Sequence, residues 1–161
     1  MDIFESVDLL SRCLKPSLMD LVIYSVYKAI NEILREDTWR VVWRSGEILL
    51  ESLDDILGIK DEKDLYNALE KIFRWLIDTG YIEHGEIKRS SENEIEYVMS
   101  TPVIGSGAEK LIKEGMVPPH ISTSLLFALL KRFGLKAEMI GRPIFLENGR
   151  VIERWRISEI R

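Results

Sequence analysis

Few residues of this sequence have the types and spacing that catalysis requires. The segment GSGAEK, residues 105–110, opens a predicted helix where backbone amides could hold an anion. It lacks the Lys-Ser/Thr ending of a phosphate-binding loop, and the chain has no G-x-S-x-G segment. Neither histidine is adjacent in sequence to Ser106 or Ser124, and no nicotinamide or flavin fingerprint is present. The sequence therefore predicts no catalytic residue and no cofactor.

Metal-binding residue types are equally sparse. Cys13 is the only cysteine, which excludes an intrachain disulfide and a metal site made of several cysteines. A lone thiol of this kind is expected to be a small buried hydrophobe. The two histidines, His84 and His120, show no paired spacing. No metal site is predicted from these residues.

Composition places the chain among globular proteins. It has 161 residues, of which 46% are apolar and 30% charged, and this length fits one domain, residues 1–161. The net charge of −5 provides no overall attraction to phosphate or to an anionic membrane. The acidic N-terminal segment MDIFESVDLLSR lacks the features of a secretory signal, so a cytoplasmic location is expected. No apolar run approaches the ~20 residues that span a bilayer, so no membrane insertion is expected.

Residues 1–79 are predicted to be mostly helical. A first helix should begin after Pro16, with Ser17 as its cap and Asp20 in its first turn. Residues 38–57 and 61–79 show apolar positions at three- and four-residue spacing, which predicts two more helices.

Residues 80–161 are predicted to form a hairpin, two helices and a second hairpin. Alternating apolar residues indicate strands at 84–100 and near 151–157. Ser106 and Glu109 resemble a capping box for a short helix, and residues 121–134 form an apolar helix. Asn148 and Gly149 favour a type I′ turn. The predicted fold is α+β, with helices packed on one antiparallel sheet made from two hairpins.

Gly46 lies in the middle of the second predicted helix. A glycine there costs about 1 kcal/mol relative to alanine, so we expect close approach of another backbone or of a ligand to offset that cost. Simple tolerance of the glycine is the alternative.

The segment FRWLIDTGYIEHGEIKRSSENEIEY, residues 73–97, also matches the last helix and wing of a winged-helix DNA binder. However, residues 61–79 carry three basic and five acidic residues, a net charge of −2 that repels DNA. Lys88 and Arg89 at the ribbon tip are the only favourable feature, and acidic residues surround them. We expect the C-terminal residues to pack against this ribbon, which makes it a sheet edge and nucleic acid an unfavoured partner.

Several segments together resemble the 4-vinyl reductase small-molecule-binding domain family and its relatives, the TRAPP-type vesicle-tethering subunits. They are RSGEIL at 44–49, GYIEHGEIKRSSENEIEYVMS at 80–100, STPVIGSGAEKLIKEG at 100–115, PPHISTSLLFALLKRFGLKAEM at 118–139 and GRVIERWRI at 149–157. The resemblance covers about three quarters of the chain. Metal-binding members of the family have cysteines where this chain has Pro118, Pro119 and His120, and again at Glu153. A soft-ligand zinc site is therefore not expected here, and whether His120 and Glu153 retain a metal role stays open.

The resemblance implies a pocket between helices and sheet for an apolar small molecule or an acyl chain, and a tendency to form a homodimer through helices. Bulky rings around the Gly46 gap could line such a pocket, although aromatic residues at helical spacing also fit an ordinary core. The expected ligand-binding residues are Trp39, Trp43, Gly46, Leu50, Phe73, Phe127 and Phe133.

Non-catalytic binding or sensing of a hydrophobic molecule is therefore the leading hypothesis. Two alternatives remain open: a winged-helix DNA-binding regulator, and a protein–protein scaffold that associates through helices.

Overall fold

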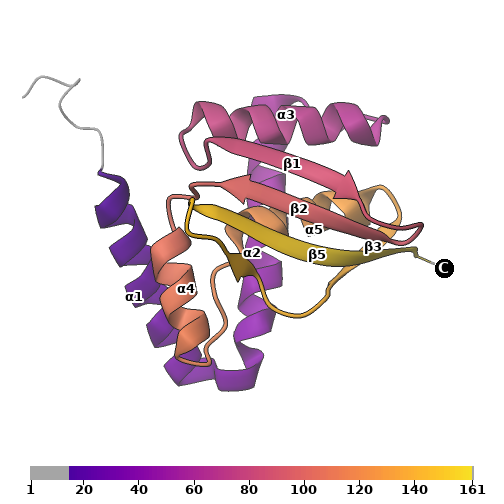
Figure 1. The fold of residues 1–161 in the computed structure, drawn as a ribbon. Helices are drawn as coiled ribbons and strands as arrows, with labels where there is room; N and C mark the ends of the chain where they lie inside the picture. The colour runs from indigo at the N-terminus through magenta and orange to yellow at the C-terminus, as the bar shows by residue number, and fades with distance from the viewer. Residues whose placement is uncertain (1–14, 161) are drawn as a thin grey trace, which may run out of the picture.

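The computed structural model describes residues 15–160. It contains five α-helices and one short 3₁₀ helix: α1 (Pro16–Leu34), η2 (Arg35–Asp37), α2 (Thr38–Leu57), α3 (Leu65–Asp78), α4 (Gly105–Lys113) and α5 (Ile121–Arg132). The strands are β1 (His84–Arg89), β2 (Glu94–Ser100), β3 (Leu135–Met139), β4 (Ile144–Phe145) and β5 (Arg150–Glu159). The arrangement confirms the predicted α+β class and the order of helices and hairpins (Figure 1).

The strands form one antiparallel sheet in the order β1-β2-β5-β3, and the short β4 also pairs with β5. The C-terminal strand β5 therefore lies inside the sheet. It pairs with β2 from Glu94↔Arg156 to Ser100↔Arg150. The prediction that the C-terminal residues pack against the ribbon is confirmed, and β1 is a sheet edge.

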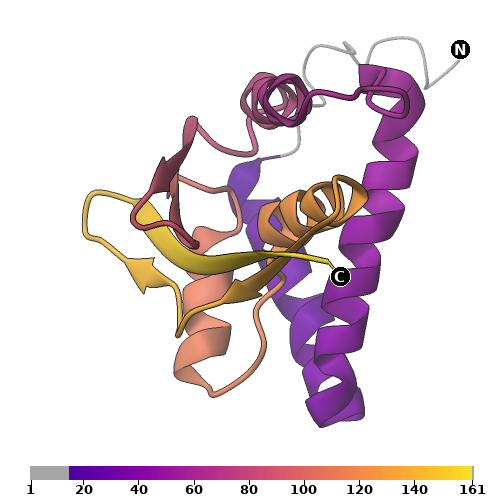
Figure 2. The same cartoon turned by 90° about the vertical axis from the view of Figure 1, so that its right-hand side faces the viewer.

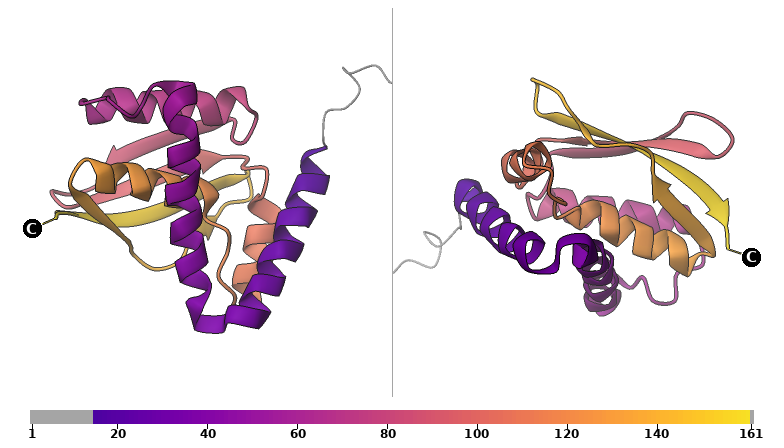
Figure 3. Two further views of the ribbon diagram at one scale, coloured as in Figure 1. Left: turned by 180° about the vertical axis from the view of Figure 1, so that it is seen from behind. Right: turned by 90° about the horizontal axis from the view of Figure 1, so that it is seen from below.

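The molecule has three layers at the level of α5. Figure 2 shows α5 between the sheet and α2, and in Figure 3 α2 crosses α5 on the side away from the sheet. This position explains why α5 is apolar on nearly every side, with Leu125, Leu126, Leu129 and Leu130 all buried. The opposite face of the sheet has no helix over it (Figure 1) and carries exposed residues such as Arg154.

Gly46 is the point where α2 and α5 touch. A Cβ atom added to Gly46 would lie 2.3 Å from both the carbonyl carbon and the carbonyl oxygen of Ser124. No side chain fits at that distance, so glycine allows the two helix backbones to come together. Of the two partners that the sequence left open for Gly46, a backbone or a ligand, the structure shows the backbone of α5.

Three predicted helix starts are wrong in detail. α1 begins at Pro16 without a side-chain cap from Ser17, and proline at the first position already supplies the required φ. α4 begins at Gly105, so Ser106 lies inside the helix and forms no capping box with Glu109. α3 begins at Leu65 rather than near residue 61. The side chain of Asp64 caps this start by accepting a hydrogen bond from the Asn67 amide.

The backbone amides near residues 105–110, which could hold an anion, bind a carboxylate of the protein itself. Both carboxylate oxygens of Asp20 accept from the Gly107 amide, at 2.9 and 3.2 Å. Asp20 lies in α1 beyond its first turn, so this hydrogen bond joins α1 to the start of α4.

The predicted type I′ turn is also wrong. Only Gly149 has a positive φ there, of 77°, whereas a type I′ turn requires one at Asn148 as well. The Gly149 amide instead donates to the Leu146 carbonyl at 3.0 Å, which gives a longer loop that ends in a left-handed glycine.

Within residues 15–160, no helix is long and apolar enough to cross a membrane. Cys13 lies outside the described residues, so its predicted burial is not addressed.

Candidate functional site

A groove lies beside α5, next to the point where Gly46 contacts Ser124. Its volume is about 610 Å³, and α2, α5 and β3 form its walls. We call it the apolar groove. Its apolar lining consists mainly of Trp43 from α2, Phe127 and Ala128 from α5, and Leu135, Ala137 and Met139 from β3. The β3 residues come from alternate positions of an edge strand, so they share the face that looks toward the helices.

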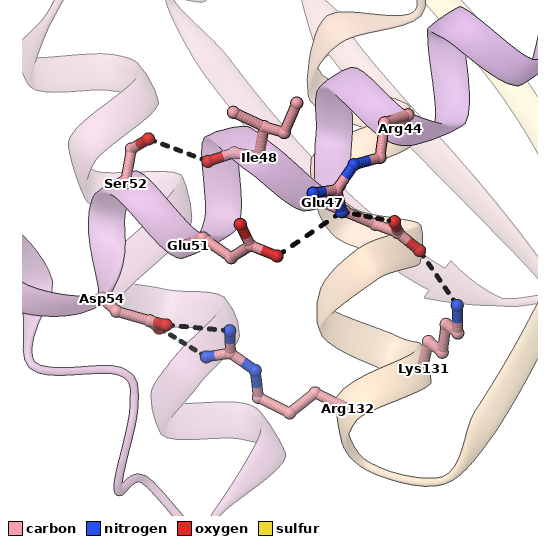
Figure 4. Close-up of polar contacts among 8 residues, drawn as sticks. All are labelled: Arg44, Glu47, Ile48, Glu51, Ser52, Asp54, Lys131 and Arg132. Carbon is pink, nitrogen blue, oxygen red and sulfur yellow. Dashed lines mark hydrogen bonds and ion pairs between the residues drawn. The ribbon is translucent and has the colours of Figure 1, made fainter.

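Charged side chains surround the opening of the apolar groove in pairs. Lys131 of α5 donates to Glu47 of α2 at 2.9 Å, and Figure 4 shows this ion pair bridging the two helices. The Lys131 hydrogen bond, followed by that of Arg44, lowers the pKa of the Glu47 carboxyl. On β3, the ion pair with Lys136 lowers the pKa of Glu138. Both lysines of the groove are thus already neutralised by a carboxylate.

A chain of aromatic rings runs from the groove into the core. Trp43 stacks on Trp39 and on Phe127, with ring centroids 5.4 and 5.2 Å apart. Phe127 meets Trp155 edge-on at 4.9 Å, and Trp155 meets Tyr97 at 5.0 Å. Such geometries contribute about 0.5–1.5 kcal/mol per pair beyond area burial. The groove wall is therefore anchored to the centre of the sheet.

A buried polar cluster lies at the start of α5. Glu153 of β5 is 3% exposed, and its Oε2 accepts from the Thr123 hydroxyl at 2.7 Å and the Trp155 indole at 3.0 Å. Its Oε1 lies 3.1 Å from Nδ1 of His120. An ionised carboxylate, which only accepts hydrogen bonds, satisfies all these donors. The cluster fixes β5 to α5 through charge-assisted hydrogen bonds.

His120 itself is held in an unusual conformation. Its φ of 47° is left-handed, which is uncommon for a residue other than glycine. Its ring stacks on Trp39 at 5.5 Å, and its side chain is only 3% exposed. Tyr97 lies opposite Glu153 in the sheet, and burial raises the pKa of its phenol.

The predicted ligand-binding residues do not surround one cavity. Trp43 and Phe127 line the apolar groove, and Trp39 lies beyond one end of it. Gly46 contacts Ser124, and Leu50 lies in the core. The other two, Phe73 and Phe133, pack against that core, and Phe73 also covers Gly85 of β1.

Sequence reasoning missed the β3 wall of the groove. Leu135, Ala137 and Met139 alternate with Lys136 and Glu138, and that period of two was the available signal. It also missed the pairing of His120 with Glu153, which depends on contacts between residues 33 positions apart.

The other residues considered for metal binding, catalysis or DNA binding do not form a site. Across residues 15–160, no group of three or more His, Cys, Asp or Glu side chains is placed to hold a metal ion. The Ser124 hydroxyl donates to the Ile121 carbonyl at 3.1 Å rather than to a histidine. The β1–β2 ribbon is not a free wing, because β2 pairs with β5, and the DNA-binding alternative gains no support from this geometry.

No protein-family model and no curated protein matches this sequence. Solved structures do share its fold. A trafficking protein particle complex subunit 3 from Naegleria fowleri, covalently bound to palmitic acid, gives a TM-score of 0.58 at 12% identity, over 89% of this chain and 95% of that one.

Proteins of the H-NOX family are similar as well. One structure, from a study of heme distortion, gives a TM-score of 0.57 at 12% identity over 98% of this chain and 78% of that one. An H-NOX protein from S. oneidensis in the Fe(II)NO state gives 0.54 at 14% identity, over 97% and 83%. At such identities the likeness establishes the fold alone, and it confirms the predicted TRAPP-like fold.

Proposed function

We propose that this protein binds an apolar small molecule or an acyl chain, without catalysis, in the apolar groove. The observation that carries the proposal is the groove itself: about 610 Å³ walled by apolar side chains from three elements. Ligand sites typically have about 300–1,000 Å³ and an apolar lining with few polar groups. The two lysines that line the groove, Lys131 and Lys136, are each paired with a carboxylate.

Two similarities support this ligand class. The trafficking subunit of related fold is bound to palmitic acid, and the resemblance to the 4-vinyl reductase domain family implies a small hydrophobic ligand. Residues 15–160 contain no cysteine, so an acyl chain held by them is bound without a thioester. A cytoplasmic location remains part of the proposal.

A heme does not fit the lining of the apolar groove. Protein hemes are held by axial ligands such as histidine, cysteine, tyrosine or methionine. Of these residue types only Met139 lines the apolar groove. Neither His84, which is exposed on β1, nor His120 lines it. We therefore propose no heme in the apolar groove.

Filling the groove tests the proposal. The variant Ala128→Phe places a ring in the apolar wall, and we expect it to abolish binding of a fluorescent C12 fatty-acid probe that the wild-type protein binds. Native mass spectrometry of the purified full chain should in addition detect a copurified apolar molecule that Ala128→Phe lacks.

Ser52→Phe is the matched control, because Ser52 is exposed on α2 and does not line the groove. It should bind the probe as the wild type does. Equal probe binding by Ala128→Phe, with a cooperative thermal transition showing that the variant is folded, would rule out the groove as the site.

A second candidate function is self-association through α1, and one observation favours it. α1 packs on α4 with one face, whereas its other face exposes a row of apolar side chains at helical spacing: Leu18, Leu21, Val22, Val26 and Ile33. The most exposed, Ile33, is 77% accessible. Antiparallel pairing of two copies would place Leu18 opposite Ile33 and Val22 opposite Ala29, so that large residues meet small ones near the centre.

Sedimentation velocity of the full chain tests this homodimer. We expect a dimer at micromolar concentration, and Val22→Glu should shift it to monomer because a charge cannot be buried unpaired in such an interface. Lys60→Glu, at an exposed residue after α2, is the control. A monomer at all concentrations would contradict self-association and leave the groove proposal unaffected.

A further inference from the structure

A second hollow adjoins one end of the apolar groove. It measures about 380 Å³, and Trp39, His120, Met139 and Arg142 are among its lining residues. We call it the end hollow. Met139 lines both hollows, and the stacked pair Trp39 and Trp43 contributes one ring to each. The side chain of Met139 is flexible and unbranched, so we expect a change of its rotamer to open a passage between the two spaces.

The end hollow holds polar groups that the apolar groove lacks. Nδ1 of His120 faces Glu153, so Nε2 lies on the opposite edge of a ring that lines the end hollow. No hydrogen bond joins Nε2 to another residue among 15–160, so this nitrogen is open to the end hollow. Arg142 likewise makes no ion pair within the described part of the chain, in contrast to Lys131 and Lys136 of the groove.

One cation at the end hollow is free to bind an anion. Arg142 is exposed and makes no ion pair with another residue of the described chain, whereas the Glu153 carboxylate already accepts hydrogen bonds from Thr123 and Trp155. A carboxylate ligand suits Arg142, because its two coplanar oxygens match the guanidinium fork.

We infer that the ligand of this protein is an amphiphile with a free carboxylate head and an unbranched apolar tail. The head binds Arg142 in the end hollow, and the tail passes Met139 into the apolar groove. This inference rests on the proposed function, and it adds the chemical class of the head group. With no cysteine in residues 15–160, these residues cannot hold the carboxylate as a thioester.

The experiment compares decanoic acid with decan-1-ol, which have the same chain length and differ in the head group. Titration calorimetry uses the delipidated full chain at pH 7, where the acid is ionised. We expect the acid to bind about tenfold more tightly, since hydrogen bonds to charged groups contribute about 1.5–3 kcal/mol and tenfold corresponds to 1.4 kcal/mol. Arg142→Gln should remove this preference. Arg154→Gln, on the helix-free face of the sheet, should keep it.

The outcomes separate this inference from the function on which it rests. Equal binding of acid and alcohol by the wild type, or an unchanged preference in Arg142→Gln, overturns the head-group assignment but leaves the groove as a site for apolar chains. Binding of neither probe by a protein that circular dichroism shows to be folded overturns the proposed function itself.

Discussion

The two sides of α5 differ in how closely they are packed. Toward α2, the backbone at Ser124 lies so near Gly46 that no side chain fits between them. Toward β3, the same helix borders a groove of about 610 Å³. At its start, α5 is also fixed to β5 through Glu153. The tight side holds the helix in place, and this allows the other side to remain open without collapse of the apolar wall.

Removing the buried carboxylate of Glu153 should reduce the stability of the protein most. Glu153→Ala leaves the Thr123, Trp155 and His120 donors without an acceptor. We expect the free energy of unfolding to fall by about 3–5 kcal/mol, because several buried groups lose their acceptor at a cost of about 1–3 kcal/mol each. Urea denaturation measures the change. Glu92→Ala, at an exposed turn residue, should have little effect. A loss below about 1 kcal/mol for Glu153→Ala would show that the cluster does not stabilise the fold.

A methyl group at the helix crossing should have the next largest effect. Gly46→Ala improves helix propensity, but its Cβ would overlap the Ser124 carbonyl group. Because the overlapping atoms belong to the backbone, α2 and α5 must separate, and we expect a loss of about 2–3 kcal/mol in the free energy of unfolding. Differential scanning calorimetry should show a lower Tm. An unchanged or higher Tm would mean that the helices are not in close contact.

A substitution at the apolar groove should reduce stability less and weaken ligand binding more. Trp43 is half-buried, and its ring touches Trp39 and Phe127. Trp43→Ala should lower the free energy of unfolding by about 1–2 kcal/mol, less than for a fully buried tryptophan. Binding of the C12 fatty-acid probe should weaken at least tenfold. A loss as large as that of Glu153→Ala would erase the distinction between the two sides.

The ion pair at the groove opening should contribute least. Lys131 lowers the pKa of Glu47 below its ordinary value of 4.5 in the folded protein. The resulting stabilisation is fully present above that value, and it is lost as pH falls through the lowered folded pKa. Because both side chains reach solvent, we expect Lys131→Met to cost less than about 1 kcal/mol at pH 7. Urea denaturation at pH 7 and pH 3 should show that the difference disappears in acid, and a difference that grows in acid would contradict this sign.

Much of the fold could be predicted from local signals. The apolar spacing of residues 38–57 matches α2, and the alternation around Val151 and Trp155 gives the buried face of β5 correctly. Gly46 also signalled a close backbone contact. The predicted caps at Ser17 and Ser106 were wrong because other residues take their place. Pro16 supplies the backbone conformation at the start of α1, and Asp20 of α1 accepts from the Gly107 amide at the start of α4.

The site could be predicted only in part, because it depends on contacts between distant segments. Trp43 and Phe127 lie on apolar faces, but nothing in the sequence distinguishes a ring at the groove from one in the core, such as Phe73. Likewise, His120 and Glu153 look like isolated polar residues in the sequence, and only the packing of the start of α5 against β5 brings them together.

The central place of β5 in the sheet has a consequence for biosynthesis. β5 joins β2 on one side to β3 and β4 on the other, and it is made after every one of them. Until the ribosome has released residues 150–159, the nascent chain exposes unpaired edges of β2 and β3 together with the apolar side of α5. Such surfaces favour aggregation, so folding of this protein should depend on chaperones that shield the growing chain until its last strand emerges.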